Sequence, residues 1–104
     1  MALGTDGDGN DQETNTCGIA KSHAYTLVDA FSMTDAGGTT HDCMLVRNPW
    51  GTSGYSGTWN EADSNWTDAL VAQVTMGIDP STAQDADGVF VVPMSSLKTC
   101  FYNF

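Results

Sequence analysis

Residues 22–47 contain the feature that most limits the fold, which is a pair of strand-like segments joined by a glycine turn. The first, "SHAYTLVDAFS" at 22–32, alternates apolar and polar residues, and the alternation fades toward its end. The second, "TTHDCMLVR" at 39–47, is rich in β-branched and apolar residues, and "AGG" at 36–38 separates the two. Strand-like runs on both sides of a short glycine turn are typical of a β-hairpin. The sequence therefore predicts an antiparallel hairpin with a loose tip.

The rest of the chain adds one helical segment and two more strands. In "SNWTDALVAQVTM" at 64–76, apolar residues recur at near-helical intervals, and Ser64 or Thr67 could cap the first turn. Strands are predicted again at 88–93 and 99–104, with a turn or one helical turn between them. These elements predict a mainly β, α+β fold, a small antiparallel or barrel-like sheet with one or two short helices.

Length and charge narrow the classes of function. A chain of 104 residues is predicted to form a single domain with a modest core. Thirteen acidic residues face three basic ones, for a net charge of −10, so nucleic acid and anionic membrane surfaces are not expected partners. No apolar run approaches a membrane span, and the first residues do not resemble a signal peptide. Residues 4–16, "GTDGDGNDQETNT", predict a flexible acidic loop within the domain.

The cysteines are three in number and have no CxxC spacing. Cys17, Cys43 and Cys100 are therefore predicted to be free thiols in a reducing compartment, with no zinc site. This interpretation places the protein in the cytoplasm.

Two polar residues at strand ends could form a site. His23 begins the first strand of the hairpin, Asn48 follows the second, and antiparallel pairing brings such positions together. The amide oxygen of Asn48 could accept from one ring nitrogen of His23, leaving the other nitrogen to face a nucleophile. Trp50 could cover that hydrogen bond and keep water away. Taken singly, a histidine at a strand start and an asparagine before proline are more often structural, and His41 is assigned to the surface.

The motifs around these residues resemble a known family. "GIAKSHAY" at 18–25, "RNPWG" at 47–51 and "GTW" at 57–59 resemble the calpain-type, papain-like cysteine proteases. "DGVF" at 87–90 resembles a further strand motif of that family, and "MALGT" resembles the strand before its variable loop. By this resemblance, the chain at 1–104 is the C-terminal half of a calpain-type catalytic core.

The resemblance implies roles for individual residues. His23 is expected to act as general base and acid, Asn48 to orient it, and Trp50 to shield the pair. The nucleophilic cysteine is expected upstream, in a half of the core that these residues do not include, because none of the three cysteines has the family's sequence context. The implied function is a subdomain of a calcium-dependent cysteine endopeptidase that acts on proteins or peptides. The chain alone is expected to be inactive, and its expected partner is the upstream cysteine-bearing half.

The resemblance also implies a calcium site that is incomplete in this sequence. Glu61 and Asp87 match acidic ligands of the family, Asp85 could add its backbone, and Gly54 and Val89 stand where the family has further acids. Ca²⁺ takes six to eight oxygen ligands, so fewer carboxylates mean weaker binding. The alternative is that all three acids are solvated loop residues.

Two other functions remain open at this point. The chain could be a catalytically dead calpain-like module used for protein binding, since the residue that decides activity lies upstream. It could also be an acidic β domain with no site, in which His23 and Asn48 only pack.

Overall fold

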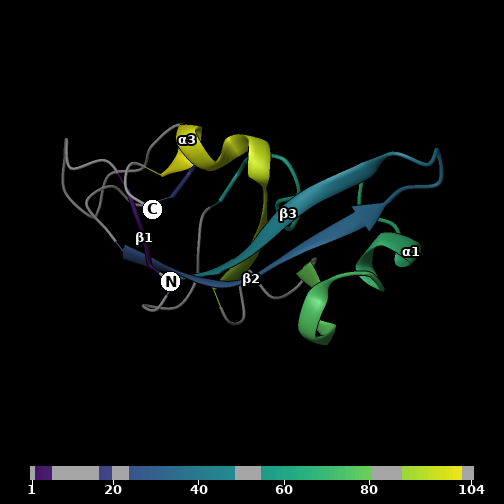
Figure 1. Ribbon diagram of the computed structural model, residues 1–104, viewed down its shortest axis with the longest axis horizontal. Coiled ribbons are helices and arrows are strands. Elements are labelled where there is room, and N and C mark those ends of the chain that lie inside the picture. Colours follow the sequence, from purple (N-terminus) through teal and green to yellow (C-terminus); the bar gives the residue numbers. More distant parts are fainter. Residues whose placement is uncertain (1, 6–16, 20–23, 49–54, 81–87, 102–104) are drawn as a thin grey trace.

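The computed structural model describes residues 2–5, 17–19, 24–48, 55–80 and 88–101. Its centre is one antiparallel sheet of four strands in the order β1-β2-β3-β4 (Figure 1). The strands are β1 (Ala2–Gly4), β2 (Ala24–Thr34), β3 (Thr40–Arg47) and β4 (Val89–Pro93). The short helices are α1 (Asp68–Val71), α3 (Leu97–Cys100) and the 3₁₀ turns η1 (Thr75–Gly77) and η2 (Met94–Ser96). The predicted mainly β, α+β fold with an antiparallel sheet is confirmed.

The predicted hairpin is present as β2 and β3. The two strands pair antiparallel from Thr26 opposite Arg47 to Thr34 opposite Thr40. β4 pairs with the second part of β3, from Cys43 to Arg47, and not with its first residues. The tip of the hairpin therefore extends past β4. Figure 1 shows this tip reaching one end of the molecule.

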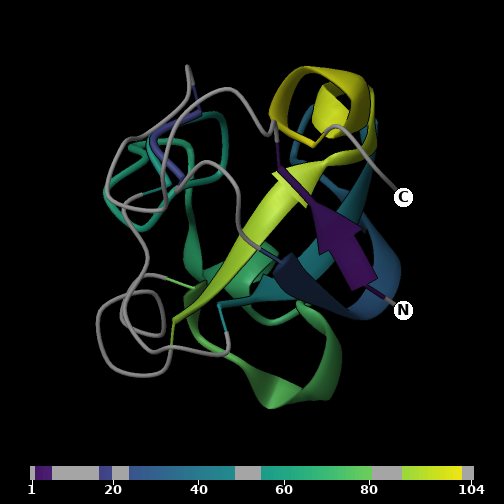
Figure 2. The same ribbon diagram turned by 90° about the vertical axis from the view of Figure 1, so that its left-hand side faces the viewer.

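Both faces of the sheet carry a hydrophobic core. The first core contains Leu3, Cys17, Ile19, Tyr25, Met44, Val46, Tyr55, Phe90, Val92, Cys100 and Phe101. The second core contains Met33, Cys43, Leu45, Trp59, Leu70, Val74, Val89 and Val91. Because successive residues of a strand point to opposite faces, β3 and β4 need the continuous apolar runs at 43–46 and 89–92. Figure 2 shows α3 and the segment around α1 on opposite sides of the sheet.

An irregularity in β2 explains why its alternation fades. The register with β3 shifts between Leu27 and Asp29, which is the mark of a β-bulge. Before the shift, Tyr25 belongs to the first core and Leu27 packs against it. After the shift, Phe31 packs against the second core and Met33 belongs to it. One extra residue therefore moves the apolar side of β2 from one core to the other.

The helix predicted at 64–76 is shorter in the structure. Thr67 is the cap, and its Oγ1 accepts from the backbone N–H of Leu70 at 3.2 Å, so Thr67 rather than Ser64 begins the helix. Before it, Asp63 Oδ1 accepts from the backbone N–H of Asn65 at 2.9 Å, a local turn that competes with helix. After it, Met76 has a φ of 63°, which ends any helical continuation.

The strand predicted at 99–104 is wrong for the residues that the structure describes. Residues 97–100 form α3, and the N–H of Phe101 donates to the carbonyl of Leu97 at 3.0 Å. Residues 102–104 lie outside the described part of the chain. The predicted helical turn after β4 is confirmed as η2, and it runs directly into α3. The aromatic run suggested a buried strand, but Cys100 and Phe101 are buried as the last residue of α3 and the residue that follows it.

The prediction of three free thiols is wrong for two of them. Cys17 and Cys100 form a disulfide with a Cα–Cα distance of 5.6 Å across 83 residues of sequence. Cys43 is free, as predicted, and it is buried. The pairing joins two sites in the first core, a proximity that the spacing of the cysteines does not reveal. Disulfides are typical of oxidising compartments, so the argument for a reducing compartment no longer holds.

The helices of the structure were compared with the length and hydropathy that a membrane span requires. Within the described ranges, no helix has the length and apolar character needed to cross a bilayer.

A count of reactive thiols will check the cysteine assignment. Burial, with a smaller contribution from Asp42, raises the pKa of the Cys43 thiol to about 11, which disfavours the reactive thiolate. Protein purified without reductant is expected to bind almost no maleimide when folded and one equivalent when denatured. Three equivalents in the denatured, unreduced protein would contradict the disulfide. Prior reduction, the control, is expected to give three equivalents after denaturation.

Candidate active site

The strand ends that would carry the catalytic pair meet at one edge of the hairpin. Thr26 lies opposite Arg47, so the beginning of β2 and the end of β3 are neighbours, as the sequence predicted. Asn48 follows β3, is half-buried, and donates its backbone N–H to the carbonyl of Gly88 at 2.9 Å. His23 and Trp50 lie outside the described residues. The framework for the pair is present, and the contact between His23 and Asn48 stays a prediction.

Aromatic rings of the first core lie beneath these strand ends. Tyr25, next to the start of β2, makes edge contacts with Phe90 and Phe101, with both centroid distances at 5.9 Å. Tyr55 stacks on Phe90 at 5.0 Å with an interplanar angle of 23°, and its hydroxyl donates to the carbonyl of Thr58 at 2.6 Å. Burial raises the pKa of the Tyr55 phenol, so it remains a neutral donor. These ring contacts hold the start of β2, the start of β4 and the segments at Tyr55 and Phe101 against one another.

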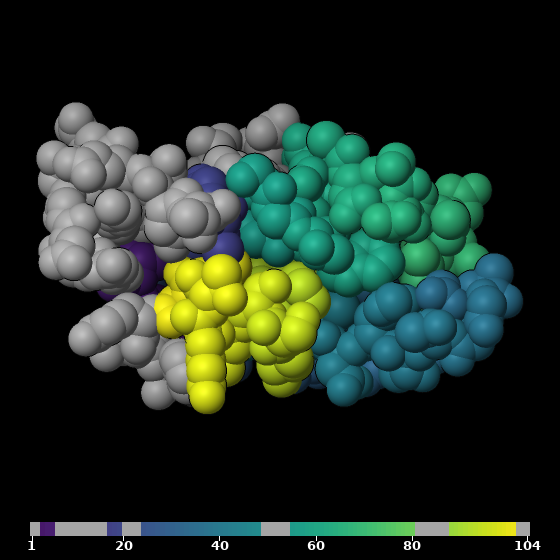
Figure 3. Space-filling model, turned by 90° about the horizontal axis from the view of Figure 1, so that it is seen from above, coloured from purple at the N-terminus to yellow at the C-terminus, as the bar shows by residue number. Residues whose placement is uncertain are grey.

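Cys17 connects the same region to the segment that begins at Tyr55. Its carbonyl accepts from the backbone N–H of Ser56 at 2.8 Å, and its sulfur is bonded to Cys100 at the end of α3. Figure 3 shows 17–19 in dark blue against the teal segment that begins at residue 55, with α3 in yellow nearby. The disulfide therefore ties the chain on both sides of the candidate site to a common core.

The predicted calcium ligands are only partly within the described chain. Glu61 lies half-buried in the loop after Trp59, whereas Asp85 and Asp87 fall outside the described residues. Nearby Asp63 is committed to the loop itself, with Oδ2 accepting from the N–H of Trp59 at 2.7 Å. Among the residues described, no three His, Cys, Asp or Glu side chains cluster in a way that could hold a metal ion. The calcium site stays a prediction.

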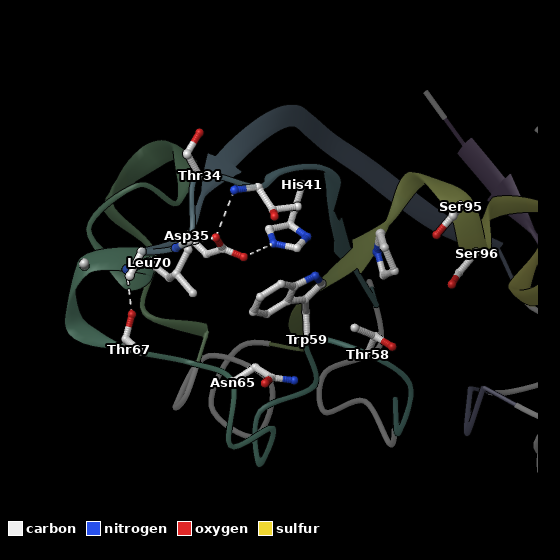
Figure 4. A pocket seen from close by; sticks show the side chains of 15 residues that line it. Thr34, Asp35, His41, Thr58, Trp59, Asn65, Thr67, Leu70, Ser95 and Ser96 are labelled. Atoms are coloured by element: carbon white, nitrogen blue, oxygen red, sulfur yellow. Dashed lines mark hydrogen bonds and ion pairs between the residues drawn. The ribbon is translucent and has the colours of Figure 1, made fainter.

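A cavity lies at the tip of the hairpin, away from the candidate active site. It has a volume of about 920 Å³ and is lined by the hairpin tip at 34–41, the loop at 58–70 and residues 93–96. Figure 4 shows His41 and Trp59 at its centre, with Asp35 and Leu70 on one side and Ser95 and Ser96 on the other. We call this the hairpin-tip pocket.

A hydrogen bond between Asp35 and His41 organises the tip beside this pocket. Asp35 Oδ2 lies 2.9 Å from His41 Nε2, and Oδ1 accepts from the N–H groups of Gly37 and Thr39 at 2.9 and 3.0 Å. The His41 ring makes an edge contact with Trp59 at 5.2 Å. Sequence reasoning assigned His41 to the surface, yet it is half-buried and paired. The signal was the position of Asp35 and His41 on either side of the predicted turn, where antiparallel strands bring residues together.

The order of the tip is expected to depend on pH. The hydrogen bond from His41, followed by that from Thr39, lowers the pKa of Asp35 in the folded protein. The stabilisation is therefore complete above the unfolded pKa of about 3.9 and is lost as pH falls through the lower folded value. Amide exchange protection at Gly37 and Thr39 is expected to fall below pH 4, after correction for intrinsic rates. The amide of Phe101 is the control, because it donates to the backbone carbonyl of Leu97 rather than to a carboxylate. Equal losses at Phe101 and Thr39 would contradict a local role for Asp35.

The chain matches one protein family along its whole length and known proteins along most of it. A family model described as calpain family cysteine protease matches residues 1–104. Calpain-5 of Caenorhabditis elegans is 26% identical over 104 residues, covering 86% of this chain and 16% of that protein. Calpain-9 of Rattus norvegicus is 34% identical over 85 residues, covering 81% of this chain and 12% of that protein. The chain thus spans less than a fifth of the length of either relative. It belongs to the calpain family of cysteine proteases.

Proposed function

We propose that this chain supplies the catalytic histidine and asparagine of a calcium-dependent cysteine endopeptidase. Family membership supports a protease, and the pairing of Thr26 with Arg47 carries the finer proposal. If the antiparallel pairing continues beyond Thr26 and Arg47, the residue before β2 and the residue after β3 lie close together at that end of the hairpin. These positions in the sequence are His23 and Asn48.

The proposed chemistry divides between this chain and the upstream half of the same catalytic core. His23 takes the proton of a cysteine thiol and later returns a proton to the leaving amine, while the thiolate attacks the peptide carbonyl. Asn48 accepts from the ring of His23 and fixes its tautomer, and Trp50 shields that bond from water. The thiol belongs to the upstream half of the core, which is the proposed partner. Without that half the chain has no nucleophile, so we expect no hydrolysis of protein or peptide substrates.

Calcium and location complete the proposal. Glu61, Asp85 and Asp87 are the proposed ligands, and carboxylate oxygens suit a hard cation such as Ca²⁺. When bound, the ion would bring the loop after Trp59 and the segment before β4 together. The cytoplasmic location stays a prediction, and the Cys17–Cys100 disulfide favours an oxidising environment instead.

Reconstitution tests the function directly. The chain is mixed with the upstream cysteine-bearing half of its parent, and cleavage of a peptide substrate is followed with and without calcium. His23→Ala is expected to lower kcat/KM at least a hundredfold, the contribution of a general base, and Asn48→Ala to lower it less. Lys98→Ala, an exposed change on α3, is the matched control and is expected to leave the rate unchanged.

The same experiment separates the rival function. Binding of the two halves without hydrolysis, together with no effect of His23→Ala, would overturn the catalytic proposal and indicate a binding module. Calorimetry with calcium alone tests the ligands, because Glu61→Gln is expected to weaken binding. No saturable heat at millimolar calcium would contradict the metal site.

A further inference from the structure

The hairpin-tip pocket is distinct from the candidate active site. Its His41 and the strand-end Asn48 are seven positions apart on one extended strand and the residue after it. At about 3.3 Å per residue, this separation is roughly 23 Å. A ligand in the pocket therefore does not occupy the strand ends where the catalytic pair is proposed.

The charges around the pocket favour a cation. Asp35 is the one carboxylate among the lining residues that the structure describes, and the lining contains no lysine or arginine. The described bases, Arg47 and Lys98, lie outside the lining, and the whole chain carries a net charge of −10. Among the described lining residues, His41 is the one basic group, and it is already hydrogen-bonded to Asp35. An anionic ligand would therefore meet the repulsion of an acidic chain with little to offset it, whereas a cation is attracted locally and at long range.

The remaining lining suits a peptide rather than a bare ion. Trp59 and Leu70, which Figure 4 shows in the pocket, and Pro93 of the lining give an apolar and aromatic wall. A long cationic side chain can pack against this wall. The side chains of Asn65 and Ser95 line the pocket and are exposed, and they make no hydrogen bond to any residue of the described ranges. Such groups can pair with a peptide backbone. The volume of about 920 Å³ is near the upper end of ordinary ligand sites, so it holds a short segment.

We propose that the hairpin-tip pocket binds a basic peptide segment, with a lysine or arginine side chain against Trp59 and its charge near Asp35. The binding itself is independent of catalysis. The further idea that this binding docks protease substrates rests on the proposed function. An extended chain of roughly seven residues spans the distance to the strand ends. Substrates docked here would carry a basic residue about that far from the bond that is cut.

Binding is tested on the 104-residue chain by NMR titration. The probe is the blocked peptide acetyl-Lys-Ser-Arg-Ser-amide, and the matched control peptide is acetyl-Glu-Ser-Asp-Ser-amide. The basic peptide is expected to shift the amides of Thr39, Trp59 and Ser96, with affinity falling as salt rises from 20 to 150 mM, about the range in which screening becomes strong. The acidic peptide is expected to give no shift.

Matched variants locate the charge. Asp35→Asn is expected to weaken binding at least fivefold, whereas Asp42→Asn removes the same charge from an exposed site outside the lining and is expected to change little. Because Asp35→Asn also alters the tip, Asn65→Lys provides a second test by adding a positive charge to an exposed lining residue. It is expected to abolish binding while leaving the Asp35–His41 hydrogen bond intact.

Several results would overturn the proposal. They are equal binding of both peptides, shifts confined to residues outside the pocket, unchanged affinity in Asn65→Lys, or competition by a neutral oligosaccharide as strong as by the basic peptide. Failure of the proposed function looks different. In that case the peptide still binds at the tip, and the reconstituted halves do not cleave.

Discussion

Reduction of the Cys17–Cys100 disulfide is expected to lower the free energy of unfolding by about 3–5 kcal/mol. The bond closes a loop of 83 residues, so its loss releases a large conformational freedom in the unfolded chain. In the folded chain, both cysteines are buried in the first core. The expected loss is a large share of the stability of a small domain. Urea unfolding followed by fluorescence, with and without reductant, measures it.

A variant separates the cross-link from general effects of the reductant. Cys17→Ala/Cys100→Ala is expected to unfold at the midpoint of the reduced native sequence, and reductant should not move it further. Cys43 is free and remains unchanged in both samples. A double variant as stable as the oxidised protein would show that the bond contributes nothing.

Phe90→Ala is expected to destabilise the protein by about 3–5 kcal/mol, the range for removing a buried aromatic ring. Phe90 is 1% exposed in the middle of the first core. It stacks with Tyr55 and meets the edge of Tyr25, and it lies opposite Val46 in the sheet. Its loss leaves a cavity that the sheet on one side prevents from closing. The midpoint of urea unfolding of the oxidised protein gives the change.

A neighbouring residue provides the control for this substitution. Met94 follows β4 and is 41% exposed, so Met94→Ala is expected to cost less than about 0.5 kcal/mol. Phe90→Leu, which keeps much of the volume, is expected to fall between the two. If Phe90→Ala and Met94→Ala cost the same, Phe90 is not a central residue of the core.

The elements that local pattern determines were predictable. The β2–β3 hairpin follows from alternation and a glycine turn, and β4 from its continuous apolar run. Thr67 could be named as a cap because its side chain acts on an amide three residues away. In each case the deciding interaction is local or repeats along the strand.

The elements that distant contacts determine were not predictable in the same way. The bulge in β2 depends on pairing with β3, and the helical turn at Cys100 depends on burial against the first core. The disulfide joins residues that only the finished fold brings together. The hydrogen bond between Asp35 and His41 depends on the register of the hairpin tip, which a predicted loose turn does not give.

The candidate site was predictable to a different degree. The placement of β2 and β3 followed from the residues themselves, while the roles of His23, Asn48 and Trp50 came from resemblance to a family. Asn48 is in the predicted place after β3. A side-chain contact between strand ends depends on rotamers and on the segment that follows "RNPWG", which neither alternation nor spacing specifies.

The bond between Cys17 and Cys100 also changes what a cut in the backbone would do. Residues 17–100 form a closed covalent ring, so a single peptide-bond cleavage between the two cysteines opens the ring without dividing the molecule. The nicked chain would migrate as one species on a gel without reductant and separate into fragments with it. Of the four strands that the structure describes, β1 alone lies outside the ring, so one cut before Cys17 could release it were it not held by its pairing with β2.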